Sequence, residues 1–121
     1  MACDKDQMMM LLQRALDKGG STHTIADVVE ALQAGKMQSI FNDSGLMITQ
    51  VLNAPQRRVM EVLFCAGELP AILSLKPDLL RLADQMACEF GRAYVRPGLV
   101  QPLIGVGWKK SHDVMTFNVG D

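Results

Sequence analysis

The sequence lacks any strong excess of charge and any recognisable cysteine pattern. Its 12 basic residues nearly balance its 13 acidic ones, so no broad positive field would attract a phosphate backbone, and we do not expect nucleic-acid binding. The three cysteines are widely spaced and include no Cys-x-x-Cys pair. This spacing argues against a disulfide framework or a zinc site, and it favours a reducing cytoplasm.

Long hydrophobic runs are also missing. The apolar run Met8–Leu12 is far shorter than the roughly 20 residues of a membrane span, and Gln13 and Arg14 interrupt it at once. Because the run follows Asp4 and Asp6 rather than a basic segment, we do not expect a signal peptide either. The 121 residues are enough to bury one core, so residues 1–121 are predicted to form a single domain.

What the sequence does contain is a pattern of three strands joined by two tight turns. The strands are predicted over residues 37–41, 46–52 and 57–65. Turn-forming residues lie between them, Asn42-Asp43-Ser44-Gly45 and then Asn53-Ala54-Pro55-Gln56. In the third strand, Met60, Val62 and Phe64 are predicted to face the core, because Glu61 alternates with them and is taken to point outward.

Helices surround these strands in the predicted order. Apolar periodicity and helix-ending residues predict the following segments: helices 6–18, 25–34, 68–75 and 78–90, a strand 93–95, a helical turn 99–104 and a last strand 108–119. The expected fold is therefore α+β, a mainly antiparallel mixed sheet of about five strands flanked by helices. The methionine-rich helix within residues 1–20 is either part of the core or a peripheral element that self-associates.

This order of elements resembles that of the GNAT-type N-acetyltransferases. The resemblance rests on short segments from about Ile25 onward, namely Ile25–Val29, Gly35–Gln38, Ala66–Leu69, Arg96–Gly98 and Gly107-Trp108. In particular, the chain looks like the small, poorly characterised GNAT-like proteins of tailed bacteriophages and prophages. The resemblance implies a GNAT-like fold, a bacterial host cytoplasm and either a virion-associated or a host-modulating role.

The chain departs from the family pattern where acetyl-CoA would bind. Enzymes of this fold hold the pyrophosphate with a [QR]-x-x-G-x-[GA] loop that opens a helix. Here the corresponding segment reads Phe64-Cys65-Ala66-Gly67-Glu68-Leu69-Pro70, with one glycine, a carboxylate and a proline that lacks an N–H group. We therefore expect no cofactor and no catalysis, and a function through contacts with a protein partner, a phage structural or host protein, or a second copy of the chain.

The alternative is a minimal N-acetyltransferase that uses acetyl-CoA. In that interpretation the backbone N–H groups of Ala66, Gly67, Glu68 and Leu69 would bind the pyrophosphate, as the resemblance implies. Glu61 would act as the base and Tyr94 as the acid that protonates the leaving thiolate. A solvent-facing glutamate and a half-buried strand tyrosine explain these two residues equally well. A third hypothesis is a small inhibitor of a host factor.

Two other candidates for chemistry have simpler explanations. Cys65 precedes a helix start, where a dipole lowers a thiol pKa, but free cysteines are commonly small buried apolar residues, and we favour that explanation. Ser111-His112-Asp113 has the residue types of a hydrolytic triad. Successive strand residues point to opposite faces, so these three cannot converge, and they and His23 are expected to be solvated.

Overall fold

The computed structural model describes residues 5–18 and 22–120. Its elements, in chain order, are α1 (Lys5–Lys18), α2 (Ile25–Gln33), β1 (Gln38–Phe41), β2 (Gly45–Asn53), β3 (Arg58–Gly67), α3 (Leu69–Leu73), α4 (Lys76–Gln85), β4 (Phe90–Ala93) and α5 (Pro97–Ile104). The strands form one sheet in the order β1-β2-β3-β4. The first three are antiparallel and β4 runs parallel to β3. The predicted α+β class is confirmed, with four strands where about five were predicted.

The two predicted turns join the strands as expected. In the first, Asn42 N–H donates to Gly45 O at 3.0 Å, and the Asn42 side-chain oxygen accepts from Ser44 N–H at 3.1 Å. The second turn is closed by a bond from Ala54 N–H to Arg57 O at 2.9 Å. Short polar side chains and Pro55 therefore fix the hairpin register, as their turn preferences predict.

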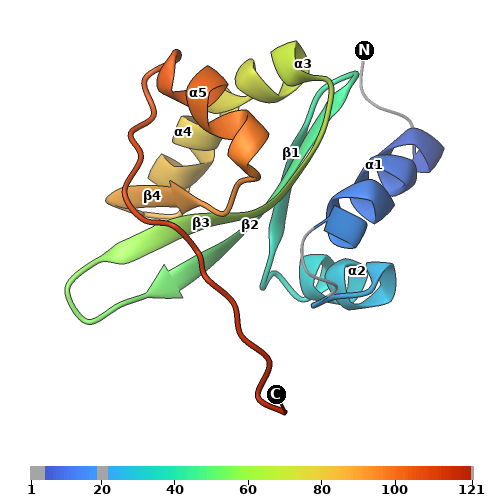
Figure 1. Cartoon of the computed structure of the whole chain (residues 1–121), viewed down its shortest axis with the longest axis horizontal. Coiled ribbons are helices and arrows are strands. Elements are labelled where there is room, and N and C mark those ends of the chain that lie inside the picture. The colour runs from blue at the N-terminus through green and yellow to red at the C-terminus, as the bar shows by residue number, and fades with distance from the viewer. Residues whose placement is uncertain (1–4, 19–21, 121) are drawn as a thin grey trace.

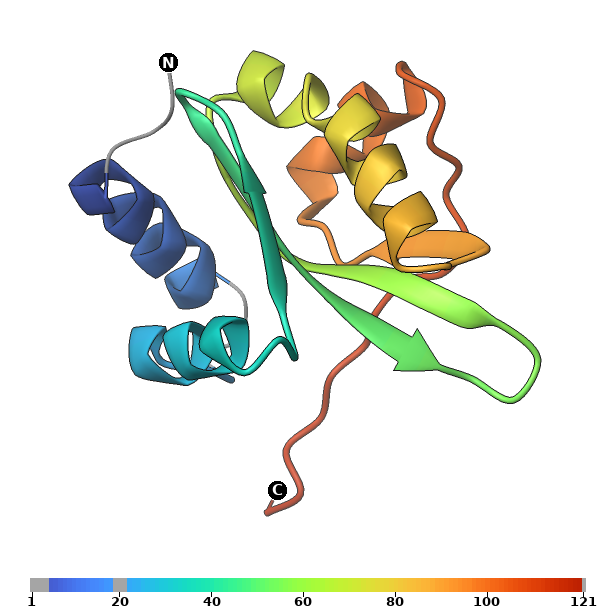
Figure 2. The same ribbon diagram turned by 180° about the vertical axis from the view of Figure 1, so that it is seen from behind.

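Helices cover both faces of the sheet. Figures 1 and 2 show α1 and α2 on one side and α3 and α4 on the other, with α5 beside α4. The α1–α2 side buries Leu11, Leu12, Ala15, Leu16, Val28, Met37, Leu46, Ile48, Phe64 and Ala66. The α3–α4 side buries Met47, Met60, Val62, Ile72, Leu75 and Leu79. The N-terminal helix is thus part of the core through its apolar face, while Met10 on the same helix is exposed.

A β-bulge corrects the predicted face of β3. The β2–β3 register changes between Ile48 and Thr49, which pair with Phe64 and Val62 and leave Leu63 as the extra residue. Such a residue reverses which face the following side chains point to. Met60 and Val62 therefore face α3 and α4, whereas Phe64 faces α1 and α2. The prediction that all three share one face is wrong.

The C-terminal third differs most from the prediction. The helix predicted over 78–90 ends at Gln85, because Ala87 adopts a left-handed conformation with φ 57° and Cys88 N–H bonds back to Ala83 O at 2.8 Å. Phe90 therefore starts β4, and the strand predicted at 93–95 lies at 90–93. The predicted turn 99–104 is contained in α5.

The strand predicted over residues 108–119 does not form. Residues 109–119 form no helix or strand and are exposed along their whole length, and the chain projects from the body as an extended tail. Trp108 anchors the root of this tail, through its N–H bond to Leu103 O at 3.0 Å and packing against the α3–α4 side.

None of the described helices combines the length and the apolar character that crossing a bilayer requires.

Candidate functional site

The sheet buries one carboxylate, that of Glu61. Only 3 % of this residue is exposed, which corrects the prediction that it points into solvent. Its Oε1 accepts a hydrogen bond from the Gln50 side-chain amide at 3.0 Å. Its Oε2 accepts from Arg92 Nε at 2.8 Å and from the Tyr94 hydroxyl at 2.9 Å. The two residues that the enzyme hypothesis pairs, Glu61 and Tyr94, are therefore in direct contact.

The strands explain why these side chains meet. Gln50 lies opposite Glu61 in the β2–β3 hairpin, and Arg92 is the β4 partner of Glu61. Tyr94 follows two residues after Arg92, so both side chains lie on the same side of the chain as Glu61. The Arg92 side chain is 47 % exposed and Tyr94 is 42 % exposed, so the cluster opens to water on their side.

The contacts keep the carboxylate charged. Burial raises the pKa of Glu61, but hydrogen bonds from Gln50, Arg92 and Tyr94 and the charge of Arg92 outweigh this effect, and the net pKa is lowered. The hydrogen bond to Glu61 raises the pKa of Tyr94, and burial adds to the increase. At neutral pH the pair is therefore a carboxylate and a neutral phenol, with Arg92 as an ion-pair partner at 2.6 Å.

Next to this cluster, β3 and β4 separate. Their register ends at the Val62–Ala93 pair, and the last backbone bond joins Tyr94 N–H to Val62 O at 3.0 Å. Beyond this point β3 continues to Gly67 and stays paired with β2. The segment that follows β4 turns away from β3 and leads into α5. The sheet thus opens between the C-terminal half of β3 and the segment after Tyr94.

The junction between β3 and α3 is where the resemblance in sequence implies a phosphate cradle for acetyl-CoA. Gly67 has φ +119°, and a Cβ placed there would lie 1.9 Å from Ser44 O, so the glycine is needed for close contact with the β1–β2 turn. Glu68 N–H donates to the same Ser44 O at 3.0 Å. One of the four N–H groups proposed for the pyrophosphate is therefore already bonded.

The rest of this junction offers little to an anion. Pro70 carries no N–H group, and α3 is only five residues long. The depression beside it has a volume of about 210 Å³ and is lined by Gln7, Met10, Leu11, Arg14, Ser44, Gly67 and Glu68. Arg14 is the one cation in this lining, and the negative charge of the Glu68 carboxylate offsets its positive charge. The residues present therefore fit a diphosphate poorly.

The remaining predicted candidates do not join the Glu61 cluster. Cys65 is half-buried against the α3–α4 side, and burial raises the pKa of its thiol to about 11, which agrees with the apolar interpretation. Ser111 and His112 contact each other at 2.6 Å on the exposed tail. His23 packs its ring edge-on against Phe64. Within the described residues, no group of three or more His, Cys, Asp or Glu side chains could hold a metal ion. Cys3 lies outside the described residues.

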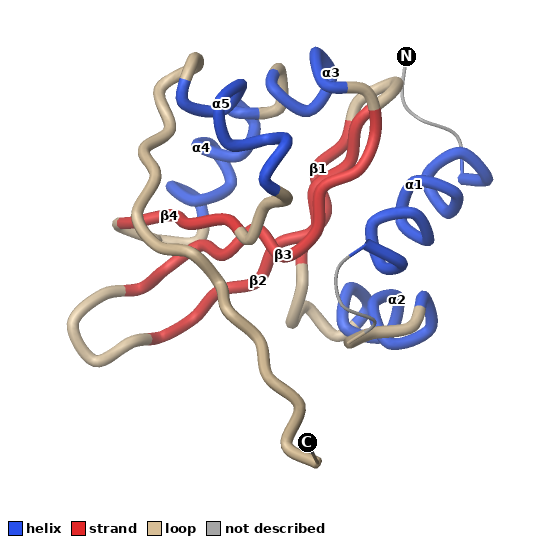
Figure 3. Tube along the Cα trace, viewed as in Figure 1, coloured by secondary structure: helices blue, strands red, loops and turns tan. Residues whose placement is uncertain are grey.

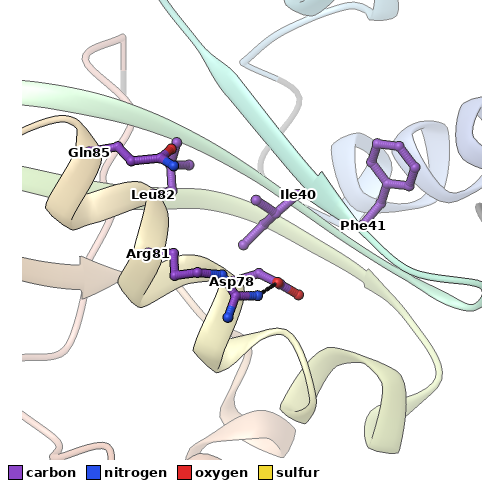
Figure 4. Close-up of a pocket in the computed structure, with 6 residues that line it drawn as sticks. All are labelled: Ile40, Phe41, Asp78, Arg81, Leu82 and Gln85. Carbon is purple, nitrogen blue, oxygen red and sulfur yellow. Dashed lines mark hydrogen bonds and ion pairs between the residues drawn. The ribbon is translucent and has the colours of Figure 1, made fainter.

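A larger depression of about 340 Å³ lies between β1 and α4. Its lining residues are Ile40, Phe41, Asp78, Arg81, Leu82 and Gln85. Figure 4 shows Asp78 and Arg81 joined as an ion pair on α4. Because the two charges in this lining neutralise each other, the depression offers no charged group for chemistry, and the Glu61 cluster remains the candidate site.

No protein-family profile and no curated protein sequence matches this chain. Among solved structures, an aminoglycoside N-acetyltransferase, AAC(6')-Iy in complex with CoA, is similar with a TM-score of 0.70 and 12 % identity, over 93 % of this chain and 86 % of that one. An acetyltransferase of Trypanosoma brucei is similar with a TM-score of 0.68 and 8 % identity, over 98 % and 97 % of the two chains. The protein TTHA1254 of Thermus thermophilus is similar with a TM-score of 0.62 and 15 % identity, over 89 % of each.

These similarities show the fold. The chain has the α+β architecture of GNAT acetyltransferases, which confirms the fold expected from the resemblance in sequence. At these identities a shared fold does not establish a shared reaction, because one fold hosts many functions.

Proposed function

We propose that this chain is a GNAT-fold protein of a phage or prophage that acts through contacts with other proteins rather than through acetyl transfer. The observation that carries the proposal is the β3–α3 junction. There Glu68 N–H is bonded to Ser44 O, Pro70 has no N–H group to offer, and the carboxylate of Glu68, the N-cap residue of α3, would repel a phosphate. The phage or prophage origin, and a place in the virion or in the host cytoplasm, rest on the resemblance in sequence.

Titration with acetyl-CoA tests this proposal directly. A ligand at 100 times its dissociation constant adds about 2.7 kcal/mol to the free energy of unfolding, which thermal denaturation detects easily. We expect no thermal shift and no binding heat with millimolar acetyl-CoA. Micromolar binding to the wild-type chain would overturn the proposal.

A variant of the junction tests the physical reason. Glu68→Gly together with Pro70→Ala removes the carboxylate and restores one N–H group, while the Gly67 contact with Ser44 stays intact. If the junction is what excludes the cofactor, this variant should bind 3′,5′-ADP or acetyl-CoA more tightly than the wild type does. Equal titrations of both proteins would contradict this explanation.

A second candidate function is a minimal acetyl-CoA-dependent N-acetyltransferase, favoured by the Glu61–Tyr94 contact beside the open end of the sheet. Glu61 would take the proton of an attacking amine, and Tyr94 would protonate the thiolate that leaves as the thioester bond breaks. The ion pair with Arg92 opposes the first step, because it lowers the basicity of Glu61.

Release of coenzyme A thiol in the presence of a panel of amines distinguishes the two functions. An enzyme would release thiol, and both Glu61→Gln and Tyr94→Phe would lower the rate. The first proposal requires that wild type and variants release thiol only at the rate of the buffer.

For the protein-contact function, affinity capture from a bacterial lysate compares the wild type with a variant of the exposed surface, Met10→Glu. A host-factor inhibitor would retain one host protein specifically.

A further inference from the structure

The half of the sheet nearest the β2–β3 turn has one face that lies outside both hydrophobic cores. Met60 and Val62 point toward α3 and α4, so Val59 and Glu61, which alternate with them, point to the opposite face. The strand residues that α1 and α2 bury on that face all lie beyond the bulge, namely Leu46, Ile48, Phe64 and Ala66. Val59 belongs to neither core, and Figures 1 and 2 show the hairpin extending beyond α2.

Two cross-strand rows form this face, because residues that pair across strands point to the same side of a sheet. The first row joins Leu52, Val59 and Phe90, and the second joins Gln50, Glu61 and Arg92. Tyr94 continues the line of Phe90 and Arg92 along the chain. Leu52, Phe90 and Tyr94 are 38 %, 40 % and 42 % exposed, so apolar and aromatic area remains open to water.

Two arginines give this face its charge. The Arg57 guanidinium lies over the Phe90 ring, 5.1 Å from its centroid, and the Arg92 side chain is 47 % exposed. Within the two rows the only carboxylate is that of Glu61, which is buried. A neighbouring molecule therefore meets positive charge and aromatic rings, the residue types that dominate protein interfaces. We call this set the arginine–aromatic surface: Leu52, Arg57, Phe90, Arg92 and Tyr94.

We propose that the arginine–aromatic surface binds an extended acidic segment of a partner protein, an inference that rests on the proposed function through protein contacts. Phe90 and Arg92 lie two residues apart on β4, which is about 7 Å along a strand. Alternate residues of an extended partner segment have the same spacing and point to one side. Two carboxylates spaced in this way meet Arg57, which lies over Phe90, and Arg92. An apolar side chain at the next such position covers Tyr94.

This surface suits an extended protein segment better than a small molecule or a nucleic acid. Neither of the two depressions described above is lined by a residue of the surface. Guanidinium groups bind carboxylates through paired hydrogen bonds. Two arginines in a chain of nearly balanced charge give too weak a positive field for a phosphate backbone. The tail crosses this region in Figure 1, but the 86 % exposure of Met115 and Phe117 shows that these apolar side chains do not pack on it.

Fluorescence anisotropy of a labelled peptide tests the proposal with the full chain. The probe Leu-Thr-Glu-Thr-Glu-Thr-Leu places both carboxylates and both leucines on one side of an extended chain, and it reads the same in either direction. The control Leu-Thr-Thr-Glu-Glu-Thr-Leu has the same composition and charge but sends its carboxylates to opposite sides. We expect saturable binding of the probe and about tenfold weaker binding of the control. No binding of the probe, or equal binding of the two peptides, would overturn the proposal.

A charge reversal tests the arginine itself. Arg57→Glu should weaken binding of the probe about tenfold or more. Lys36→Glu is the matched control, because it makes the same change of charge at an exposed residue before β1, at the opposite edge of the sheet, and it should leave binding nearly unchanged. Arg57→Glu should in turn bind Leu-Thr-Lys-Thr-Glu-Thr-Leu more tightly than the wild type does. Equal affinities of Arg57→Glu and wild type for both peptides would overturn the proposal.

Other occupants of the surface give different results in the same assays. A single-stranded oligonucleotide that displaces the probe and binds more tightly than it would assign the surface to nucleic acid. Self-association of the chain that Arg57→Glu abolishes, measured by sedimentation, would assign it to a second copy. Either result would overturn the proposal.

The lysate capture separates this inference from the proposed function. A protein that wild type and Arg57→Glu retain equally, and that Met10→Glu loses, would leave the protein-contact function standing and overturn the role of the arginine–aromatic surface. Micromolar binding of acetyl-CoA would instead overturn the proposed function and leave the peptide titrations as they stand.

Discussion

Glu61 is the residue whose surroundings matter most, since it is a nearly inaccessible carboxylate with three donors around it. A carboxylate whose pKa is lowered in the folded state stabilises the protein fully above its unfolded pKa, about 4.3. That stabilisation is lost as pH falls through the lower, folded pKa. Acid unfolding of this protein should therefore depend on Glu61.

Replacing Glu61 by Gln tests this dependence. Gln keeps the shape but loses the charge, so we expect the free energy of unfolding at pH 7 to fall by about 1–3 kcal/mol. The deficit relative to the wild type should shrink as pH drops below about 4.5, because the wild type then loses the same charge. Urea unfolding from pH 7 to pH 3 measures it, with Glu30→Gln on the exposed surface of α2 as control. A deficit that stays constant with pH would contradict the assignment.

The thiol of Cys65 gives a second prediction at this scale. With a pKa of about 11, its thiolate fraction at pH 8 is roughly a hundredfold below that of an ordinary cysteine. Alkylation by iodoacetamide, followed by peptide mass spectrometry, should label Cys65 slowly in the native protein and rapidly in urea. Fast native labelling would instead mark an activated thiol.

Half of the Glu61 cluster can be predicted from the sequence. Glu61 and Tyr94 were named through the resemblance, whereas Gln50 and Arg92 were missed. A signal for Gln50 was present, because a hairpin closed between Asn53 and Arg58 places Gln50 opposite Glu61. Arg92 was hidden by the helix predicted through Phe90, which left no strand for it to occupy. The burial of Glu61 depends on these two neighbours and could not be predicted without them.

Among the connections between elements, the one from β3 to α3 depends on Gly67. Its positive φ and its contact with Ser44 leave no room for a side chain. Gly67→Ala should lower the free energy of unfolding by more than about 2 kcal/mol, from backbone strain and the clash together. Gly35→Ala separates the two effects, because Gly35 has φ +75° and nothing within 4 Å, and should cost only about 1 kcal/mol. Thermal and urea unfolding of both variants check this; similar losses would show that the Ser44 contact is unimportant.

Elements were predicted well where local chemistry decides them. Short-range interactions fix these elements: the capping box of Thr24 and Asp27 starts α2, and the turn residues Asn42 and Pro55 close the two hairpins. Accordingly, α2 and both hairpins lie where they were predicted. The end of α4 was misplaced because Ala87 terminates it in a conformation usually adopted by glycine. The strand predicted at 108–119 failed for another reason, since alternation shows that a segment can form a strand and not where its partner lies.

For the molecule as a whole, the sheet separates two hydrophobic cores, one under α1 and α2 and one under α3 and α4, which have no buried residue in common. Leu46→Ala and Leu75→Ala each remove a fully buried side chain, on opposite faces, and each should cost about 2–5 kcal/mol. Because the two residues belong to different cores, the double variant should lose the sum within about 0.5 kcal/mol. Urea unfolding of the four proteins measures the coupling. A larger coupling energy would mean that the sheet transmits packing changes between its faces.

The α+β class and the GNAT architecture could be predicted because they follow from the order of helices and strands. The number of strands could not, because it depends on whether residues 109–119 find an edge. The two-sided covering of β3 was also missed. Its residues read as a strand with one core face and one solvent face, and only the bulge at Leu63 lets Phe64 and Val62 serve different cores.

That extra residue makes this position of β3 tolerant of a change in length. Removing Leu63 would bring Phe64 directly after Val62, and both residues would keep their present faces and their β2 partners, because successive residues of a regular strand point to opposite sides. The two packed layers would keep their contents, and only the local bend of the bulge would be lost. A one-codon deletion at this position should therefore still fold, as should Leu63→Val.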